Sequence, residues 1–158
     1  MRAFASRLVF ALGLTLVLGG APALSGCDSG SGSICESNTD QFAFEDITPD
    51  GADLGETIAV GNCVAVEYVG TLAEGGEMFD EGGFDFYYVQ NGGLISGFIL
   101  GMQGQRVGET RRVTIPPTLG YGETALEGRG DNAGIPSCST LTFEITLTRI
   151  YADPRRCG

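Results

Sequence analysis

The chain has 158 residues, a length typical of a single domain. Nine arginines and twenty acidic residues give it a formal charge of −11, and it contains no lysine and no histidine. The lack of histidine excludes an imidazole base, a serine–histidine triad and a histidine metal ligand. The acidic balance argues against nucleic acid as a partner, because phosphate binding needs a basic surface.

The first 26 residues have the pattern of a bacterial lipoprotein signal peptide. Arg2 and Arg7 precede an apolar run over residues 8–18, which is too short to span a bilayer. Residues 24–27 (LSGC) resemble the lipobox, in which the cysteine receives a diacylglycerol. The alternatives are an ordinary secretory signal with a chance cysteine, or an uncleaved anchor. We expect cleavage before Cys27, lipid attachment there, and a place in the bacterial cell envelope that faces the periplasm or the exterior.

The remaining cysteines are Cys35, Cys63, Cys138 and Cys157. An exported protein folds in an oxidising compartment, so an even number of cysteines predicts two disulfides, for which three pairings are possible. No C-x-x-C pair occurs, which argues against a redox motif or a zinc site. We expect no metal and no cofactor.

Residues 27–40 are rich in serine, glycine and aspartate, a composition typical of a flexible tether. From Gln41 onward the pattern changes to short alternating apolar runs separated by glycine, proline and aspartate. We therefore expect a folded domain over residues 41–152, followed by a short C-terminal tail over residues 153–158.

Five runs in this domain predict β-strands. In the last and longest run, Leu141, Phe143, Ile145 and Leu147 share one face. One helix is predicted from an N-cap at Ser96 to the neighbourhood of residue 104. The pattern indicates an α+β fold in which an antiparallel sheet buries one face against the short helix. The predicted strands cover residues 42–44, 63–72, 84–89, 110–115 and 140–151.

Several local motifs then occur in an order that resembles the FKBP-type peptidyl-prolyl cis-trans isomerases, at near-family spacing. The resemblance covers about Phe42 to Tyr151, and it implies a five-stranded antiparallel twisted sheet wrapped around one short helix. Each motif alone is weak, but their joint order is specific. The motifs are Tyr68 to Leu72, Phe79-Asp80, Phe84 to Phe86, Leu94 to Phe98, Met102, Val107-Gly108, Thr114 to Pro117, Tyr121-Gly122, Gly134 to Pro136, and Thr140 to Phe143.

In that family the substrate pocket lies between the sheet and the helix. The resemblance implies that the Ile95 N–H and the Tyr121 hydroxyl hydrogen-bond carbonyl groups of the bound peptide. Phe98 stands where the family usually places a tryptophan as the pocket floor. Carried over position by position, the pocket residues are Tyr68, Phe79, Asp80, Phe84, Leu94, Ile95, Phe98, Tyr121, Ile135 and Phe143.

Spacing alone also allows a simpler interpretation of these residues. Tyr68 and Phe143 at alternating strand positions, and Phe98 and Met102 four apart on a helix, are typical of a plain core. Asp80 is typical of a turn carboxylate. Only the joint order of the motifs favours a pocket over these readings.

The resemblance implies an enzyme that isomerises X-Pro bonds of exported proteins. Rotation of an amide needs no nucleophile and no proton shuttle, so a chain without histidine but with nine phenylalanines and five tyrosines is compatible with it. The partners would be proline-containing polypeptides and, through the lipid, a membrane, with the protein a monomer. The alternatives are a catalytically weak chaperone or peptide-binding module of the same fold, and a purely structural lipoprotein whose side chains fill the pocket.

The topology implied by the resemblance also bears on the cysteines. It places the final strand beside the strand over residues 63–72, which favours the pairs Cys63–Cys157 and Cys35–Cys138. Two loops depart from the family pattern. The connection from Asp80 to Phe84 is shorter than usual, and the loop over residues 123–134 is longer and charged.

Overall fold

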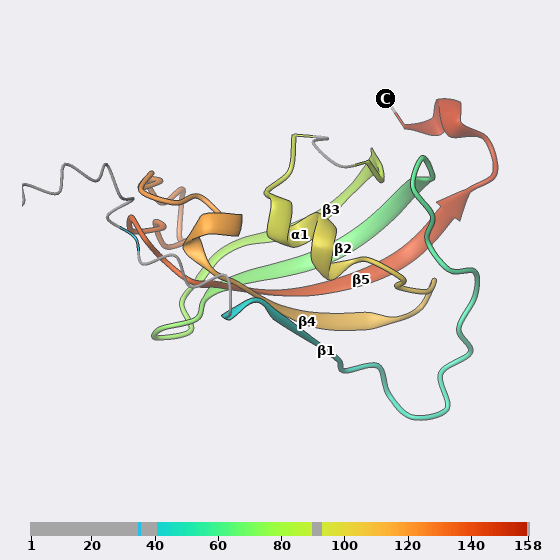
Figure 1. The fold of residues 1–158 in the computed structure, drawn as a ribbon, viewed down its shortest axis with the longest axis horizontal. Helices are drawn as coiled ribbons and strands as arrows, with labels where there is room; N and C mark the ends of the chain where they lie inside the picture. Colours follow the sequence, from blue (N-terminus) through green and yellow to red (C-terminus); the bar gives the residue numbers. More distant parts are fainter. Residues whose placement is uncertain (1–34, 36–40, 90–92, 158) are drawn as a thin grey trace, which may run out of the picture. The chain divides into compact units, whose positions relative to one another are not determined.

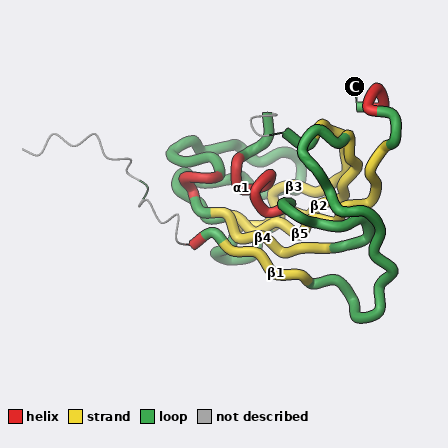
Figure 2. The backbone as a smooth tube through the Cα atoms, turned by 45° about the vertical axis from the view of Figure 1, so that its right-hand side comes forward, coloured by secondary structure: helices red, strands yellow, loops and turns green. Residues whose placement is uncertain are grey.

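The computed structural model describes residues 35, 41–89 and 93–157. The expected signal peptide, Cys27 and nearly all of the expected tether lie outside the described residues. Within these described ranges, no helix is long and apolar enough to cross a membrane. The described residues contain one five-stranded antiparallel sheet and a short α-helix that lies across one face of it (Figures 1 and 2).

The strands follow the order β1-β4-β5-β2-β3 across the sheet. Neighbouring strands are antiparallel throughout, and β5 is the central strand. The helix α1 spans Ser96–Gly101, and a 3-10 turn, η2, follows β4. The bounds are β1 (Ala43–Asp46), β2 (Cys63–Leu72), β3 (Met78–Tyr87), β4 (Thr110–Ile115), η2 (Pro117–Leu119), β5 (Leu141–Tyr151) and a C-terminal 3-10 turn, η3 (Pro154–Arg156).

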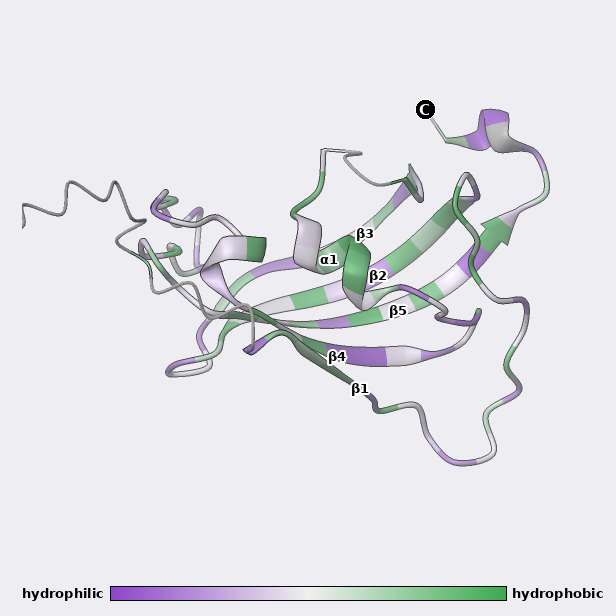
Figure 3. Cartoon of the chain, viewed as in Figure 1, coloured by the Kyte–Doolittle hydropathy of each residue, from purple (hydrophilic) through white to green (hydrophobic). Residues whose placement is uncertain are grey.

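The core lies between α1 and one face of the sheet. On that face, apolar residues at alternate positions of β2, β4 and β5 are buried. Leu141, Ile145 and Leu147 of β5 are fully buried, and Phe143 is almost so. Side chains alternate between the two faces of a strand, so this spacing puts all four on the helix side. Figure 3 shows the resulting alternation of apolar and polar bands along β2 and β5.

The structure confirms the expected fold class and corrects several element boundaries. β1 covers Ala43–Asp46 instead of beginning at Phe42, and β5 begins at Leu141, one residue after the expected start. β3 begins at Met78, well before residue 84, because Gly82 and Gly83 pair with Tyr68 and Glu67 of β2 instead of forming a turn. The same strand ends at Tyr87, two residues before the expected end. The predicted helix end near residue 104 was also too late, since α1 ends at Gly101.

The predicted N-cap at Ser96 was wrong. Ser96 is the first residue of the helix, and the cap position is occupied by Ile95, with an extended ψ of 142° and no side-chain cap hydrogen bond. A helix of six residues without a cap has little stability of its own, because helix nucleation is costly. Tertiary contacts must therefore hold α1 in place.

Two glycines and one arginine provide such contacts. Gly97 and Gly101 face Ile115 and Val113 of β4 so closely that a Cβ atom at either glycine would clash with those side chains. The Arg111 guanidinium donates hydrogen bonds to the carbonyls of Gly101 (3.2 Å) and Gln103 (2.7 Å), just after the helix. A cation at this end is favourable, since it faces the negative end of the helix dipole.

The positive charge of Arg111 is neutralised inside the protein by a carboxylate. Its Nε forms a 2.5 Å ion pair with Glu109, and both side chains are almost completely buried. The guanidinium also lies 4.9 Å from the centre of the Phe44 ring on β1. The end of the helix is thus tied to two strands of the sheet.

Both disulfides are present in the pairing that the family topology favoured. Cys63 at the start of β2 is bonded to Cys157, and it lies opposite Tyr151 at the end of β5. Cys35 is bonded to Cys138, which precedes β5 at its other end. Each bridge closes a loop of roughly one hundred residues.

Candidate functional site

Nine of the ten residues that the resemblance singled out line one cavity of about 150 Å³ between the sheet and α1. The tenth, Ile135, is buried and lines an adjoining cavity of about 340 Å³, which shares Phe79, Asp80 and Tyr121 with the first. Gly93 also lines this cavity, although no pattern in the sequence indicated it. We call the first cavity the aromatic pocket; its lining is Tyr68, Phe79, Asp80, Phe84, Gly93, Leu94, Ile95, Phe98, Tyr121 and Phe143.

Different parts of the sheet and two segments outside it supply these side chains. Tyr68 comes from β2 and Phe143 from β5, while β3 provides one wall. Phe98 projects from α1, and Tyr121 follows the η2 turn. Because these elements are far apart in the chain, the pocket exists only in the folded state.

Phe98 is the floor of the pocket. It is 4 % exposed, and its ring packs edge-on against Tyr68 (centroids 6.1 Å apart, planes at 87°) and Phe143 (5.4 Å, 86°). Phe143 in turn packs edge-on against Phe79 at 5.4 Å, and Phe84 lies 6.2 Å from Phe98. Edge-to-face contacts of this kind are the favoured arrangement of aromatic rings. The cluster forms a fixed apolar lining.

Gly70 makes room for that lining. A Cβ atom there would lie 2.6 Å from the Phe79 ring and 3.0 Å from the Phe143 ring. The sequence signal for this role is a glycine inside a β-branched strand, a pattern that often marks close approach of another group. Gly70 therefore lets the edges of two rings approach the backbone of β2 closely.

One hydrogen bond lies at the rim of the pocket. The Tyr68 hydroxyl donates to Oδ2 of Asp80 at 2.6 Å, a distance typical of a bond to an ionised acceptor. Burial, and then this bond to Asp80, raise the pKa of Tyr68 to about 12. Burial, followed by the charge of Asp80, also raises the pKa of Tyr121. Both phenols thus remain hydrogen-bond donors at neutral pH.

No group of three or more His, Cys, Asp or Glu side chains is placed to hold a metal ion in the described part of the chain. The chemistry available in the pocket is therefore that of an apolar surface, two phenol hydroxyls, one carboxylate and the backbone.

Comparison with known proteins identifies the family. Residues 55–148, more than half of the chain, match the FKBP-type peptidyl-prolyl cis-trans isomerase family. The chain belongs to this family. It is 42 % identical over 99 residues to FK506-binding protein 3 of Debaryomyces hansenii, and 37 % identical over 103 residues to the peptidyl-prolyl cis-trans isomerase FKBP53 of Arabidopsis thaliana. These matches cover 61 % and 63 % of this chain but only 21 % and 20 % of the relatives.

Solved structures of FKBP proteins share the fold. The crystal structure of AtFKBP13 has a TM-score of 0.59 and 27 % identity, covering 72 % of this chain and 95 % of that one. A peptidyl-prolyl cis-trans isomerase from Pseudomonas syringae pv. tomato has a TM-score of 0.53 and 31 % identity, covering 71 % and 77 %.

Two segments that were expected to depart from the family pattern, residues 81–83 and 123–134, lie next to residues that line the aromatic pocket. The three residues between Asp80 and Phe84 run within β3 and add no loop above it. The loop over residues 123–134 is held in place by a pair of backbone hydrogen bonds between Leu126 and Ile135, and by the Cys138 N–H, which donates to the Gly122 carbonyl at 2.7 Å. This loop lines the adjoining cavity of about 340 Å³ through Leu126, Glu127, Arg129, Asn132 and Ala133.

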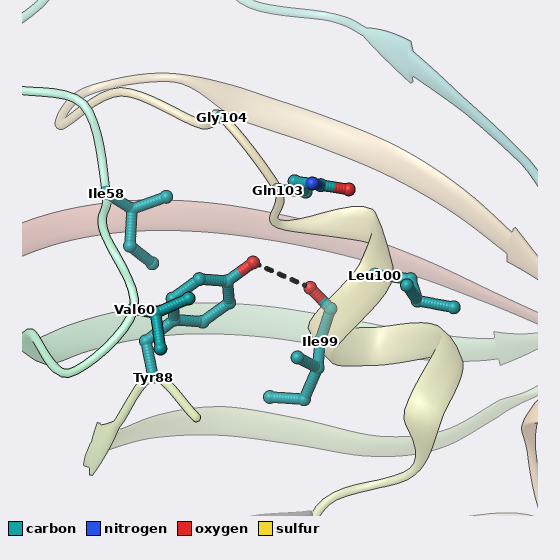
Figure 4. Close-up of a pocket in the computed structure, with 7 residues that line it drawn as sticks. All are labelled: Ile58, Val60, Tyr88, Ile99, Leu100, Gln103 and Gly104. Carbon is teal, nitrogen blue, oxygen red and sulfur yellow. Dashed lines mark hydrogen bonds between the residues drawn. The ribbon is translucent and has the colours of Figure 1, made fainter. Parts of the chain in front are cut away.

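A further cavity, of about 220 Å³, lies against α1 and shares no lining residue with the aromatic pocket; we call it the Tyr88 cavity. Figure 4 shows the Tyr88 hydroxyl pointing at the carbonyl of Ile99, to which it donates a hydrogen bond of 3.2 Å. Ile58 and Val60 reach this cavity from the segment that precedes β2. Tyr88 thus bonds to α1 from a cavity that contains none of the residues lining the aromatic pocket.

Proposed function

We propose that the protein is a peptidyl-prolyl cis-trans isomerase that acts on X-Pro bonds of exported polypeptides. The observation that carries this proposal is the aromatic pocket, in which residues from β2, β3, β5, α1 and the segment after η2 meet around Phe98. Its volume of about 150 Å³ suits a small apolar ring such as that of proline.

The pocket has the properties that amide rotation needs. Resonance gives the C–N bond double-bond character and a rotation barrier of about 18–20 kcal/mol. In the twisted transition state this resonance is lost, and the carbonyl oxygen becomes less negative. A surface of Phe98, Phe143 and Tyr68 that excludes water therefore favours the twisted amide over the planar, better solvated one.

The polar groups of the site orient the substrate. The backbone N–H of Ile95, at the cap position of α1, and the hydroxyl of Tyr121 would donate hydrogen bonds to peptide carbonyls on either side of the proline ring. Asp80 accepts the Tyr68 hydroxyl proton in a hydrogen bond and so fixes the orientation of that ring. No covalent bond forms or breaks in this mechanism.

A protease-coupled assay on a short X-Pro peptide tests the proposal. The wild-type protein is expected to accelerate isomerisation, and Tyr121→Phe is expected to lower kcat/KM about tenfold, the equivalent of one lost hydrogen bond of roughly 1.4 kcal/mol. Val60→Ala is the control, because that side chain is exposed and lies outside the aromatic pocket. Wild-type protein that gives no rate above the uncatalysed background would refute the proposal.

The second candidate is a peptide-binding module with weak catalysis. Phe98 favours it, since a phenylalanine gives a smaller floor than the tryptophan usual at this position in the family. Binding of an X-Pro peptide, measured by fluorescence anisotropy, without acceleration of its isomerisation would support this candidate. The third reading, a pocket closed by its own side chains, is disfavoured by the open volume above Phe98.

We further propose that the protein is a lipoprotein, attached through Cys27 to a membrane of a bacterial cell envelope. Two disulfides in the folded domain support export to an oxidising compartment. Incorporation of a labelled fatty acid that is lost in Cys27→Ser would agree with this proposal, whereas unchanged labelling would contradict it. The folded domain is proposed to act as a monomer, which sedimentation analysis of the purified protein tests.

A further inference from the structure

The outer edge of β3 is unpaired over its middle. β3 is the last strand of the sheet. The Ala133 N–H donates to the Met78 carbonyl (3.0 Å) at the strand's start, and the Tyr151 hydroxyl of β5 donates to the Asp85 side chain (2.9 Å). Among the described residues, no backbone hydrogen bond joins residues 81–85 to a neighbour on the outer side. Tyr88 exchanges backbone hydrogen bonds with the chain before β2. Tyr88 therefore points its backbone N–H and C=O groups toward the β2 side. Along an antiparallel strand the side to which these groups point alternates from residue to residue, so Glu81, Gly83 and Asp85 point theirs outward.

Two residues of this strand, Asp80 and Phe84, link the free edge to the aromatic pocket, and Figure 1 shows β3 at the edge of the sheet. Asp80 and Phe84 of β3 line the pocket, and residues 81–83 lie between them. At Gly82 the nearest neighbour that a Cβ atom would meet is the Tyr68 ring, at 3.9 Å. Gly82 and Gly83 are both exposed and have no side chain. A polypeptide that leaves the pocket between Asp80 and Phe84 therefore meets the backbone of two glycines.

The surroundings of the edge are acidic at its Glu81 end, while at the Asp85 end Arg149 and Arg156 lie against the ring of Tyr151, which bonds Asp85. A hollow of about 610 Å³ on the outer face of the sheet is lined by Glu67, Glu81 and Glu144, and by no basic residue. Glu144 is paired with Arg112 at 2.8 Å, but no ion pair involves Glu67 or Glu81 among the described residues. A second copy of this chain would bring like charges together at the edge, and like charges placed opposite one another are destabilising. A basic polypeptide bound at the edge would instead place opposite charges together.

We propose that the edge from Glu81 to Asp85 binds the substrate stretch next to the proline as an added strand, and that the acidic residues around it favour lysine and arginine in that stretch. This inference rests on the proposed isomerase function, and it names the substrate class: extended, basic, proline-containing segments. Backbone hydrogen bonds supply the affinity in such strand addition, and side chains supply the selectivity.

Four synthetic peptides with the same X-Pro core test the proposal on the full-length chain. One is the short core alone, one is extended by lysines, one is extended by glutamates, and one is the lysine peptide with alternate backbone nitrogens methylated. Methylation removes the pairing N–H groups and leaves the side chains unchanged, so the protein itself is not perturbed.

At low salt the lysine peptide is expected to give a kcat/KM about two- to fivefold above that of the glutamate peptide, as for a few exposed charge pairs. The difference should shrink as salt is added, because exposed charges are screened. Methylation should return the lysine peptide to the level of the core. Glu81→Gln should reduce the ratio between the lysine and glutamate peptides, and Glu56→Gln, an exposed residue that lines none of these cavities, should not.

Equal rates for the core and lysine peptides, or a rate unaffected by methylation, would overturn the proposal. So would a concentration-dependent dimer that the lysine peptide does not dissociate, since the edge would then hold a second copy. If the core peptide itself is not turned over, the isomerase function fails instead. In that case the anisotropy of the labelled lysine peptide, with and without methylation, still decides whether the edge binds.

Discussion

The contact between α1 and β4 leads to a prediction in which two effects oppose each other. Replacing a helical glycine by alanine normally stabilises a helix by about 1 kcal/mol. At Gly101, however, the new Cβ atom would lie 2.6 Å from both methyl groups of Val113, where ordinary carbon contacts begin near 3.4 Å. The helix and the strand must then separate by about 0.8 Å, and Val113 is fully buried in a strand that cannot move easily.

We expect the clash to win in Gly101→Ala. Overpacking of this size costs about 1–3 kcal/mol, so after the gain of about 1 kcal/mol in helix propensity the free energy of unfolding should fall by up to about 2 kcal/mol. The hydrogen bond from Arg111 to the Gly101 carbonyl would lengthen as well. Because α1 carries Phe98, the pocket floor should shift, and kcat/KM for a short X-Pro peptide should fall severalfold.

Urea denaturation followed by circular dichroism, with both disulfides intact, measures the effect on stability. Ser96→Ala is the matched control, since Ser96 is an exposed residue of the same helix with no capping bond, and its change should stay within about 0.5 kcal/mol. A Gly101→Ala protein as stable as the wild type, with unchanged kcat/KM, would show that α1 does not lie directly on β4.

Three further predictions concern the framework of the site. Arg111→Met leaves the buried carboxylate of Glu109 without its partner and should lower the free energy of unfolding by about 3 kcal/mol in urea; a loss close to zero would contradict the buried pair. Replacing Cys35 and Cys138 by serine should cost about 2–4 kcal/mol and speed amide exchange in residues 123–134; unchanged exchange would contradict it. Tyr68 has a pKa raised to about 12 in the folded protein, so the folded state favours the protonated phenol. The difference in the free energy of unfolding between the wild type and Tyr68→Phe should therefore be full below about pH 10 and decline as the pH rises toward 12. A difference that grows over that range would refute this sign.

The strands that alternate most regularly were predicted best. β2 and β4 have the predicted bounds, and β5 begins one residue later than expected. In these segments the side-chain period matches the burial pattern, with Leu141, Ile145 and Leu147 inward, so a local rule suffices. The start of β3 was missed because two consecutive glycines usually mark a turn. Their pairing with β2 depends on the partner strand, which the local sequence does not show.

The pocket could not be predicted from spacing alone. Tyr68, Phe98 and Phe143 have the spacing of ordinary core residues, and only the order of the family motifs brought them into one expected site. The structure shows why the residues themselves are ambiguous: Phe98 and Phe143 are each 4 % exposed, as buried as any core residue, and the open cavity lies beside them. Contacts that position the site, such as that of Gly101 with Val113, depend on distances between elements and leave no pattern in the sequence.

A last prediction separates the positioning of α1 from contact with the substrate. Tyr88 lines the cavity of about 220 Å³ against α1, where it donates a hydrogen bond to the Ile99 carbonyl (Figure 4). It does not line the aromatic pocket. Tyr88→Phe should lower the free energy of unfolding by about 0.5–1.5 kcal/mol, the usual worth of such a bond. If this bond helps to hold α1, kcat/KM for the core peptide should fall as well, although no atom that meets the substrate has changed.

The control for this prediction comes from the same cavity. Val60 is 74 % exposed and forms no hydrogen bond to α1, so Val60→Ala should change neither stability nor kcat/KM. A Tyr88→Phe protein that loses stability but keeps the wild-type kcat/KM would show that the contacts with β4 and Arg111 position the helix without Tyr88. A six-residue helix is not stable in isolation, so the position of Phe98 in the pocket depends on the contacts that α1 makes with the rest of the domain.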